Sequence, residues 1–271
     1  MKPAPFEYAR PQTVEEAVRL LATTPDAKVL AGGQTLGPML NLRLAQPAVL
    51  IDIGRIPELA AVTEDRDAVT IGATVTHAAI EDGRIQDPTG GFLAQVASGI
   101  AYRAVRTRGT IGGSLAHADP AADWLSTLTA LGAEVVIAGA RTNRRVALSA
   151  FVRGAMETEL GADEVLLGVR IPRFSRHARF GFYKICRKTG EFAEAIGVVV
   201  DDPESAYFCA VAGATGGRPL VMEMRVAPGP KGITIDEAQT LLKLARFTSD
   251  SYELKLHAVA LKNASEKAYA A

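Results

Sequence analysis

The sequence predicts an α+β fold, and three observations point to it. Apolar runs with strand propensity are short and end at glycine or proline. Helical patterns lie between them without the regular strand–helix alternation of a parallel sheet. Beyond residues 172–175 the hydrophobic pattern changes to strand-like runs separated by turn residues. A chain of 271 residues that is 48% hydrophobic can build one large domain or two modest ones.

The first predicted helix covers residues 13–22, TVEEAVRLLA. Thr13 can act as its N-cap, Glu15 and Glu16 favour the positive N-terminal end, and apolar residues recur at helical spacing. Further helices are predicted at residues 36–44, 95–102 and 122–132, the last with Gly132 at its C-terminal cap. Strands are predicted at residues 27–33, 48–53, 68–76, 133–139 and 164–172, where Pro172 ends the run.

We place a domain boundary near residues 172–175, where a strand ends in PRFSR. The boundary separates residues 1–173 from residues 174–271. Antiparallel strands are expected downstream at residues 180–186, 195–201, 206–214 and 223–227. Amphipathic helices at residues 234–245 and 252–270 are expected to pack on that sheet.

Composition excludes several classes of function. The formal net charge is zero, which argues against a nucleic-acid footprint or an electrostatic membrane anchor. No apolar run approaches the roughly 20 residues of a membrane span, and MKPAPFEYAR lacks the apolar region of a signal peptide. A cytoplasmic protein is therefore expected.

Metal and nucleotide motifs of the familiar kinds are absent from the sequence. Cys186 and Cys209 are the only cysteines, whereas an iron–sulfur cluster needs about four, so we expect both to be buried as small apolar side chains. The four histidines form no H-x-x-x-H pair, so no metal site is expected. The chain has neither G-x-G-x-x-G nor G-x-x-x-x-G-K-[ST], so a bound nucleotide would need another arrangement of backbone amides.

Two glycine pairs supply such an arrangement. VLAGGQTL covers residues 29–36, and TIGGSLAHADPAAD covers residues 110–123. Each pair follows a strand-like run, so we expect two turns with backbone at positive φ. Two turns of this kind can wrap the two phosphates of a dinucleotide with backbone N–H donors and little positive charge.

Read together, these segments resemble the FAD-binding medium subunit of the molybdenum hydroxylases, the family of carbon monoxide and xanthine dehydrogenase flavoproteins with a PCMH-type FAD-binding domain. The resemblance covers nearly the whole chain. It runs through FEYARPQTVEEAVRLL, AGGQTLGPMLNLRL, IDIGRIPEL, IGATVTHAAIE, RTRGTIGGSLAHADPAADW, VRIPRF and YKICRKTGEFA, with a weaker C-terminal match. It implies that residues 1–173 form two subdomains, at about 1–55 and 56–173, that grip the FAD pyrophosphate between them.

The resemblance also implies which residues contact FAD. From the first glycine segment these are Val29, Leu30, Ala31, Gly32, Gly33, Gln34, Thr35 and Leu36. From the second they are Thr110, Gly112, Gly113, Ser114, His117 and Asp123. Ile100, Ala101 and Leu167 would add apolar contacts, and Lys184 would reach towards the flavin ring.

Alternatives remain open at several of these positions. Asp123 fits a cofactor ligand, but also an N-cap or surface residue ahead of the helix that follows it. His117 fits a cofactor contact or packing at the edge of the loop. Tyr183 and Arg187 compete with Lys184 for the place near the flavin, and the charged run around Arg187 is typical of a solvated face.

Three positions depart from the family pattern, in two places. Ser114 stands where the family often has asparagine, and its hydroxyl can still form hydrogen bonds. Tyr102 and Arg103 stand where the family commonly has His-Pro. The sequence does not assign a role to that second change.

The function that the resemblance implies is electron transfer through non-covalent FAD. Substrate would be oxidised at molybdopterin on a large partner chain, and electrons would cross 2Fe–2S clusters on a small one, in a dimer of heterotrimers. No residue here would act as an acid, base or nucleophile on that substrate. A self-sufficient FAD-dependent oxidase and a flavin-free assembly scaffold are the alternatives. The sequence leaves the substrate and the terminal electron acceptor open.

Overall fold

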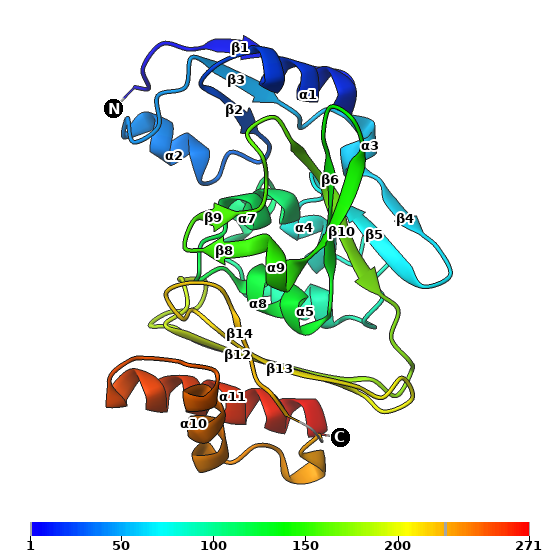
Figure 1. The fold of residues 1–271 in the computed structure, drawn as a ribbon, viewed down its shortest axis with the longest axis vertical. Helices are drawn as coiled ribbons and strands as arrows, with labels where there is room; N and C mark the ends of the chain where they lie inside the picture. Colours follow the sequence, from blue (N-terminus) through cyan, green and yellow to red (C-terminus); the bar gives the residue numbers. More distant parts are fainter. Residues whose placement is uncertain (1, 225–226, 271) are drawn as a thin grey trace.

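The computed structural model describes residues 2–224 and 227–270. Three lobes, each built on one sheet, follow one another along the long axis of the molecule (Figure 1). The N-terminal lobe holds a parallel sheet of three strands in the order β1-β3-β2. The middle and C-terminal lobes hold antiparallel sheets in the orders β4-β5-β10-β6-β7 and β11-β12-β13-β14. This mixture confirms the predicted α+β class.

The N-terminal lobe forms where the sequence predicts it. Its strands are β1 (Glu7–Ala9), β2 (Ala27–Leu30) and β3 (Val49–Asp52), and its helices are α1 (Val14–Thr23), α2 (Leu36–Asn41) and α3 (Pro57–Ala60). The Thr13 hydroxyl caps α1 by accepting from the Glu16 amide, as expected. Helix α2 ends earlier than the predicted range of 36–44.

The middle lobe packs short helices on one face of its sheet (Figure 1). Its strands are β4 (Val62–Glu64), β5 (Ala68–Gly72), β6 (Glu134–Ala138), β7 (Asn143–Ala147) and β10 (Val165–Pro172), with a separate hairpin of β8 (Val152–Gly154) and β9 (Glu157–Thr158). Its helices are α4 (His77–Glu81), α5 (Phe92–Ser98), α6 (Arg103–Arg106), α7 (Ile111–His117), α8 (Asp123–Ala130) and α9 (Leu148–Phe151). Gly132 follows α8 with φ of 63°, as its predicted capping role requires.

The C-terminal lobe lays a sheet across the middle lobe and covers its far face with helices (Figure 1). Its strands are β11 (Arg179–Ile185), β12 (Ala195–Asp202), β13 (Tyr207–Gly213) and β14 (Leu220–Val221), followed by the 3₁₀ turn η1 (Gly229–Lys231), α10 (Ile235–Leu244) and α11 (Ser251–Tyr269). Strand β12 is buried on both faces: Val198 and Val200 pack towards the middle lobe, whereas Val199 packs under α11. This is why its sequence is a continuous apolar run.

Several predicted elements are wrong in extent, and the strand predicted at residues 68–76 ends at Gly72. The helix predicted at residues 95–102 ends at Ser98, and the following residues form a loop that carries part of the candidate site. The strand predicted at residues 223–227 is replaced by β14, and Glu223 and Met224 lie outside any strand. Residues 225–226 of that prediction lie outside the described residues.

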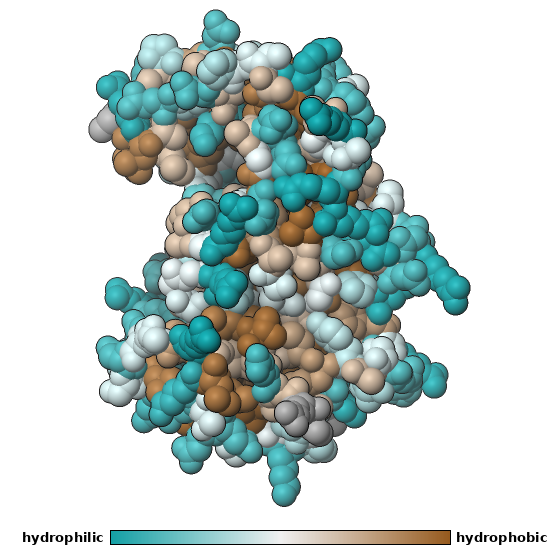
Figure 2. Space-filling view, viewed as in Figure 1, coloured by the Kyte–Doolittle hydropathy of each residue, from teal (hydrophilic) through white to brown (hydrophobic). Residues whose placement is uncertain are grey.

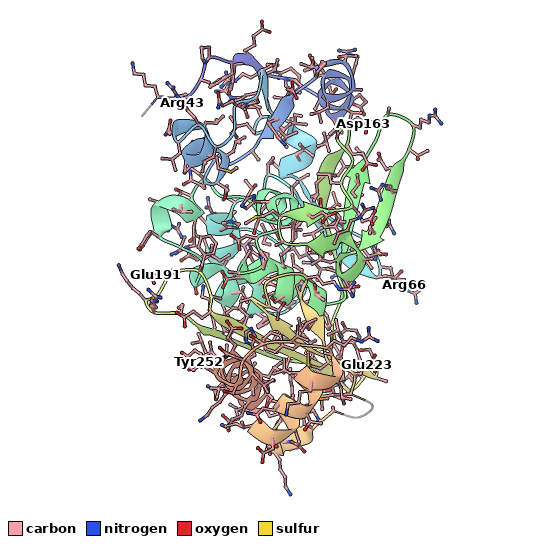
Figure 3. The ribbon with its side chains drawn as sticks, turned by 60° about the vertical axis from the view of Figure 1, so that its left-hand side comes forward. Arg43, Arg66, Asp163, Glu191, Glu223 and Tyr252 are labelled. Carbon is pink, nitrogen blue, oxygen red and sulfur yellow. The ribbon has the colours of Figure 1, made fainter. Side chains whose placement is uncertain are left out.

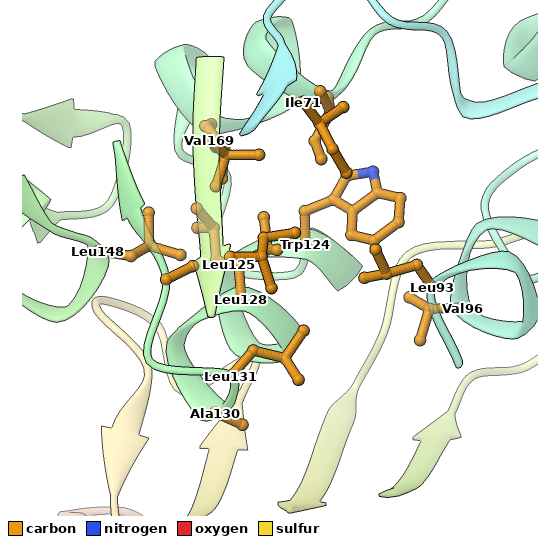
Figure 4. Close-up of a cluster of buried hydrophobic side chains, with 14 of the residues drawn as sticks. Ile71, Leu93, Val96, Trp124, Leu125, Leu128, Ala130, Leu131, Leu148 and Val169 are labelled. Atoms are coloured by element: carbon orange, nitrogen blue, oxygen red, sulfur yellow. The ribbon is translucent and has the colours of Figure 1, made fainter. Parts of the chain in front are cut away.

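The core of the middle lobe is centred on Trp124, which lies near Ile71 and Leu93 (Figure 4). The indole Nε1 donates to Nδ1 of His77 at 3.0 Å. Burial lowers the pKa of His77 to about 4, and the positive charge of Arg106 adds to that effect. The imidazole is therefore neutral in the native protein at neutral pH, and its Nδ1 accepts a hydrogen bond from the indole N–H.

We predict that His77 makes the fold acid-sensitive. The unfolded chain binds a proton at His77 below its ordinary pKa of 6.5, whereas the native protein does so only near 4. The free energy of unfolding should therefore fall as the pH drops from 6.5 to about 4. His77→Gln should flatten this fall in urea titrations at several pH values. His177→Gln, at an exposed position, serves as the control. Equal slopes in wild type and His77→Gln would contradict the role.

Candidate functional site

A polar cleft of about 390 Å³ lies where the N-terminal lobe meets the middle lobe. The space-filling view shows the surface hollowed between these lobes (Figure 2). The cleft is lined by Tyr8, Arg10, Leu30, Ala31, Gly32, Asp52, Gly54, Arg55, Thr74, Thr76, Thr107, Arg108 and Thr110. Members of both glycine segments therefore share one wall.

The first glycine segment joins β2 to α2 and turns as expected. Gly33 has φ of 70°, a left-handed conformation that glycine adopts at little cost. A Cβ at Gly32 would overlap the carbonyl oxygen of Arg108, so glycine is required for the first segment to pack on the residues just before the second. The Gln34 amide donates to the Gly32 carbonyl, and Thr35 precedes α2 with its hydroxyl not used as a cap.

The second glycine pair is not the expected turn. Gly112 and Gly113 lie in the first turn of α7, so neither has positive φ. Thr110 is the N-cap, and its hydroxyl accepts from the Gly113 amide. A Cβ at Gly112 would lie 2.5 Å from that of Ala73, so glycine permits close packing here. The pair therefore places the start of a helix, rather than a loop, beside the first segment.

The cleft also contains groups that sequence reasoning missed. The hydroxyl of Thr74 is buried without a hydrogen-bond partner among the described residues. Arg55 and Arg108 are exposed, and neither forms an ion pair with a described residue. Thr74 stands in a run that the sequence identifies only as a strand, and both arginines look like ordinary loop residues. Only the fold brings them to the cleft.

A second cluster joins the middle lobe to the C-terminal lobe. Nζ of Lys184, on β11, lies 2.8 Å from Oδ1 of Asp123 and donates to the Gly99 carbonyl oxygen at 2.8 Å. The side chains of Lys184 and Asp123 are 8% and 9% exposed. Burial raises the pKa of Asp123, and the nearby ammonium group partly offsets that rise. No motif in the sequence pairs Lys184 with Asp123, because the two residues are remote from each other along the chain.

This cluster excludes two of the alternatives for Asp123 and shows where the competitors of Lys184 lie. Asp123 is neither an N-cap nor a surface residue: Ala122 is the N-cap of α8, and Asp123 is buried in its first turn. Tyr183 faces the opposite side of β11 and packs against the α10–α11 cluster, where Lys267 lies 5.0 Å from its ring. Arg187 is exposed and pairs with Glu194. Of the three competitors, Lys184 alone faces Asp123.

The remaining predicted residues lie around these two clusters. Ile100 and Ala101 follow Gly99 directly, and His117 is the half-buried last residue of α7, with Ser114 one turn before it. Val29 and Leu167 pack against the same apolar cluster of the N-terminal lobe. Leu36 begins α2. The charged run after β11 is solvated as expected, with Glu191 far from the body of the lobe (Figure 3).

Tyr102 and Arg103, two of the residues that depart from the family pattern, lie on the surface. Tyr102 is 55% exposed, and Nζ of Lys188 lies 6.0 Å from its ring centroid. Arg103 donates to Glu81 and Asp82 at 2.6 Å.

Neither cysteine belongs to either of the two clusters described above. Cys186 and Cys209 are free but only half-buried, so the prediction of full burial is wrong. Within residues 2–224 and 227–270, no group of histidine, cysteine and carboxylate side chains is arranged to hold a metal ion. Across the same ranges, no helix has the length and apolarity needed to cross a membrane.

Comparison with known proteins gives these clusters a context. Residues 4–174 match the family model described as the FAD binding domain in molybdopterin dehydrogenase. The chain is 41% identical over 196 residues to the carbon monoxide dehydrogenase medium chain of Hydrogenophaga pseudoflava, which covers 72% of this chain and 68% of that one. It is 37% identical over 196 residues to the caffeine dehydrogenase subunit beta of a Pseudomonas species, covering 72% and 66%.

A solved structure extends the similarity to the whole chain. It is carbon monoxide dehydrogenase from Hydrogenophaga pseudoflava, in a form that lacks the Mo-pyranopterin moiety of the molybdenum cofactor. The two chains superpose with a TM-score of 0.89 at 33% identity, and the match covers 99% of each. The likeness therefore includes the C-terminal lobe, which lies beyond the family model.

We predict that Lys184 and Asp123 depend on each other. Lys184→Met leaves a buried carboxylate without its counter-charge and should reduce the free energy of unfolding by about 3–5 kcal/mol. Asp123→Asn in the same background should recover part of that loss. Urea titration of wild type, both single variants and the double variant measures the coupling. Lys262→Met, which breaks an exposed helix pair, is the control and should cost about 0.5 kcal/mol or less. A double variant no more stable than Lys184→Met would contradict the coupling.

Proposed function

The chain belongs to the family of FAD-binding domains of molybdopterin dehydrogenases, and we propose that it is the electron-transfer flavoprotein subunit of a molybdenum hydroxylase. The observation that carries the proposal is the direct packing of Gly32 on Arg108 and Gly109, which brings the first glycine segment beside Thr110 at the start of the second. That contact puts a left-handed glycine turn beside the capped start of α7, whose first amides are already paired within the chain.

The site offers what a cofactor pyrophosphate needs. Gly33, Gln34 and Thr35 would hold it from the N-terminal lobe, and the Ser114 hydroxyl would contact it from α7, at the turn that Gly113 keeps open. The unpartnered Thr74 hydroxyl and the two arginines add donors and positive charge nearby. Val29 and Leu167 supply an apolar surface beside the same segments. We assign the adenosine half of FAD to this end, held without a covalent bond.

The isoalloxazine ring belongs at the other cluster. Ile100 and Ala101 offer backbone and apolar contacts. His117 is the last residue of α7 and precedes Asp123 by six residues in the sequence. Lys184 keeps a positive charge at a site that is otherwise nearly dry. A cation near the ring favours its reduced, anionic form, so Lys184 would raise the potential of the flavin. This assignment makes residues 1–173 the FAD domain, with residues 174–271 contributing the lysine.

The bound FAD would accept electrons singly and release them in pairs. Relatives named as medium chains or subunits point to a complex of several chains. We assign substrate oxidation to a large molybdopterin chain, the 2Fe–2S relay to a small chain, and the assembly to a dimer of heterotrimers. This chain would hold and tune the flavin, and it would perform no acid–base chemistry on the substrate.

FAD content tests the first half of the proposal. Gly33→Val forces a β-branched residue into a left-handed conformation, and Gly113→Val places a Cβ 2.8 Å from the capping hydroxyl of Thr110. Each variant should lose most of its FAD, measured by absorbance of the folded, purified protein. Gly216→Val, also at positive φ but in open space, is the control and should keep it. Full retention of FAD in both site variants would refute the two-segment grip.

Purification from the native source tests the second half. The chain should emerge with a large and a small partner, and only that complex should oxidise an organic substrate. The isolated, FAD-loaded chain should still exchange electrons with artificial dyes, because that reaction needs the flavin alone. Substrate turnover by the metal-free single chain would instead show a self-sufficient oxidase. Absence of flavin from the wild-type protein would show a scaffold.

A further inference from the structure

Two buried cations hold three successive backbone carbonyls. Lys184 donates to the Gly99 oxygen at 2.8 Å. The next two oxygens, of Ile100 and Ala101, both accept from Nη1 of Arg106, at 2.9 and 3.1 Å. All three oxygens therefore face positive charge, although they belong to a loop without regular secondary structure.

Arg106 is itself held rigidly. Its Nε and Nη2 donate to the two carboxylate oxygens of Glu81, each at 2.8 Å. Its side chain is 12% exposed, and the hydrogen bonds from Arg106 are the main cause that lowers the pKa of Glu81. The planar guanidinium thus uses one edge for the carboxylate and its remaining nitrogen for the loop. A lysine could not make both sets of contacts.

The loop that Arg106 holds is in a costly conformation. Ala101 has φ of 43°, in the left-handed region that residues with a Cβ avoid. On its other side, Gly190 forms a bridge with Ile100, and a Cβ at Gly190 would lie 2.5 Å from the Ala101 oxygen. The segment is therefore fixed from two sides, by Arg106 and by the backbone after β11.

We propose that Arg106, braced by Glu81, is a positioning residue that sets the backbone of residues 99–101 against the flavin ring. This inference rests on the proposed function. Its physical content is that the guanidinium stabilises a strained loop that would otherwise relax and move the ring-facing backbone. Nothing in this role requires Arg106 to touch the cofactor.

Arg106→Lys is the sharpest test, because it keeps the charge that acts on His77 and removes only the fork. Losing one or two hydrogen bonds to a charged group should weaken FAD binding roughly 10-fold to 100-fold. The visible circular dichroism of any flavin still bound should change, since the ring would sit against a different backbone. Glu81→Gln should shift both readouts in the same direction by a smaller amount.

Arg103→Lys is the matched control. Arg103 shares the carboxylate of Glu81 but is 48% exposed and donates to no backbone oxygen of the loop. This variant should bind FAD within about twofold of wild type and keep its spectrum. An equal loss in Arg103→Lys and Arg106→Lys would overturn the proposal, because it would trace the effect to general loss of ion pairs.

A second route reaches the same loop with Arg106 intact. Gly190→Ala pushes a Cβ towards the Ala101 oxygen and should produce the same change in flavin circular dichroism. In the FAD-free protein, amide hydrogens of residues 99–102 should exchange faster in Arg106→Lys than in wild type. Folded Arg106→Lys with wild-type affinity, spectrum and exchange would refute the inference. Failure of the wild type to bind FAD would instead refute the proposed function.

Discussion

The buried ion pair between Lys184 and Asp123 is the constraint on which the arrangement of the lobes depends. Two charges with less than a tenth of their side-chain surface exposed are tolerated only if they stay together. Strand β11 must therefore keep its register, because a slip of one residue would turn Lys184 to the face where Tyr183 packs under the helices. The C-terminal lobe is in this way tied to the start of α8 and, through the Gly99 carbonyl, to the end of α5.

The two ends of the candidate site are built by different physical means. At the glycine segments, close packing requires residues without a Cβ, and the polar groups are those of the first segment, the Thr74 hydroxyl and the cleft arginines. The arginines at that end are exposed to water, so their side chains can move and salt screens their charges. At the other end, charged side chains are dry and fixed by hydrogen bonds to backbone oxygens. Exposed, mobile arginine side chains are suited to holding an anion. A buried charge in a fixed position is suited to setting the reduction potential of a flavin.

Elements that depend on local chemistry could be predicted from the sequence. Thr13 caps α1, Gly132 ends α8, and the apolar run of β12 is a buried strand, because each depends on neighbouring residues alone. The sequence predicts a turn at the second glycine pair because the pair follows a strand-like run and glycine adopts positive φ readily. The pair starts a helix instead, because the amides of Ile111 and Gly112 pair with Val75 and Ala73, which are remote in sequence. The ion pair of Asp123 is just as non-local, so no pattern around either residue reveals it.

The arginine-rich segment before α7 shows why composition alone cannot assign roles. Arg103 lies at the surface among carboxylates, Arg106 is buried against backbone oxygens, and Arg108 lines the cleft while its own carbonyl packs on Gly32. Arg103 and Arg106 lie three residues apart on one face of α6 and share Glu81, whereas Arg108 follows the end of that helix. Identical residue types thus serve the surface, a strained loop and a polar cleft. The difference arises entirely from what the fold places opposite each guanidinium.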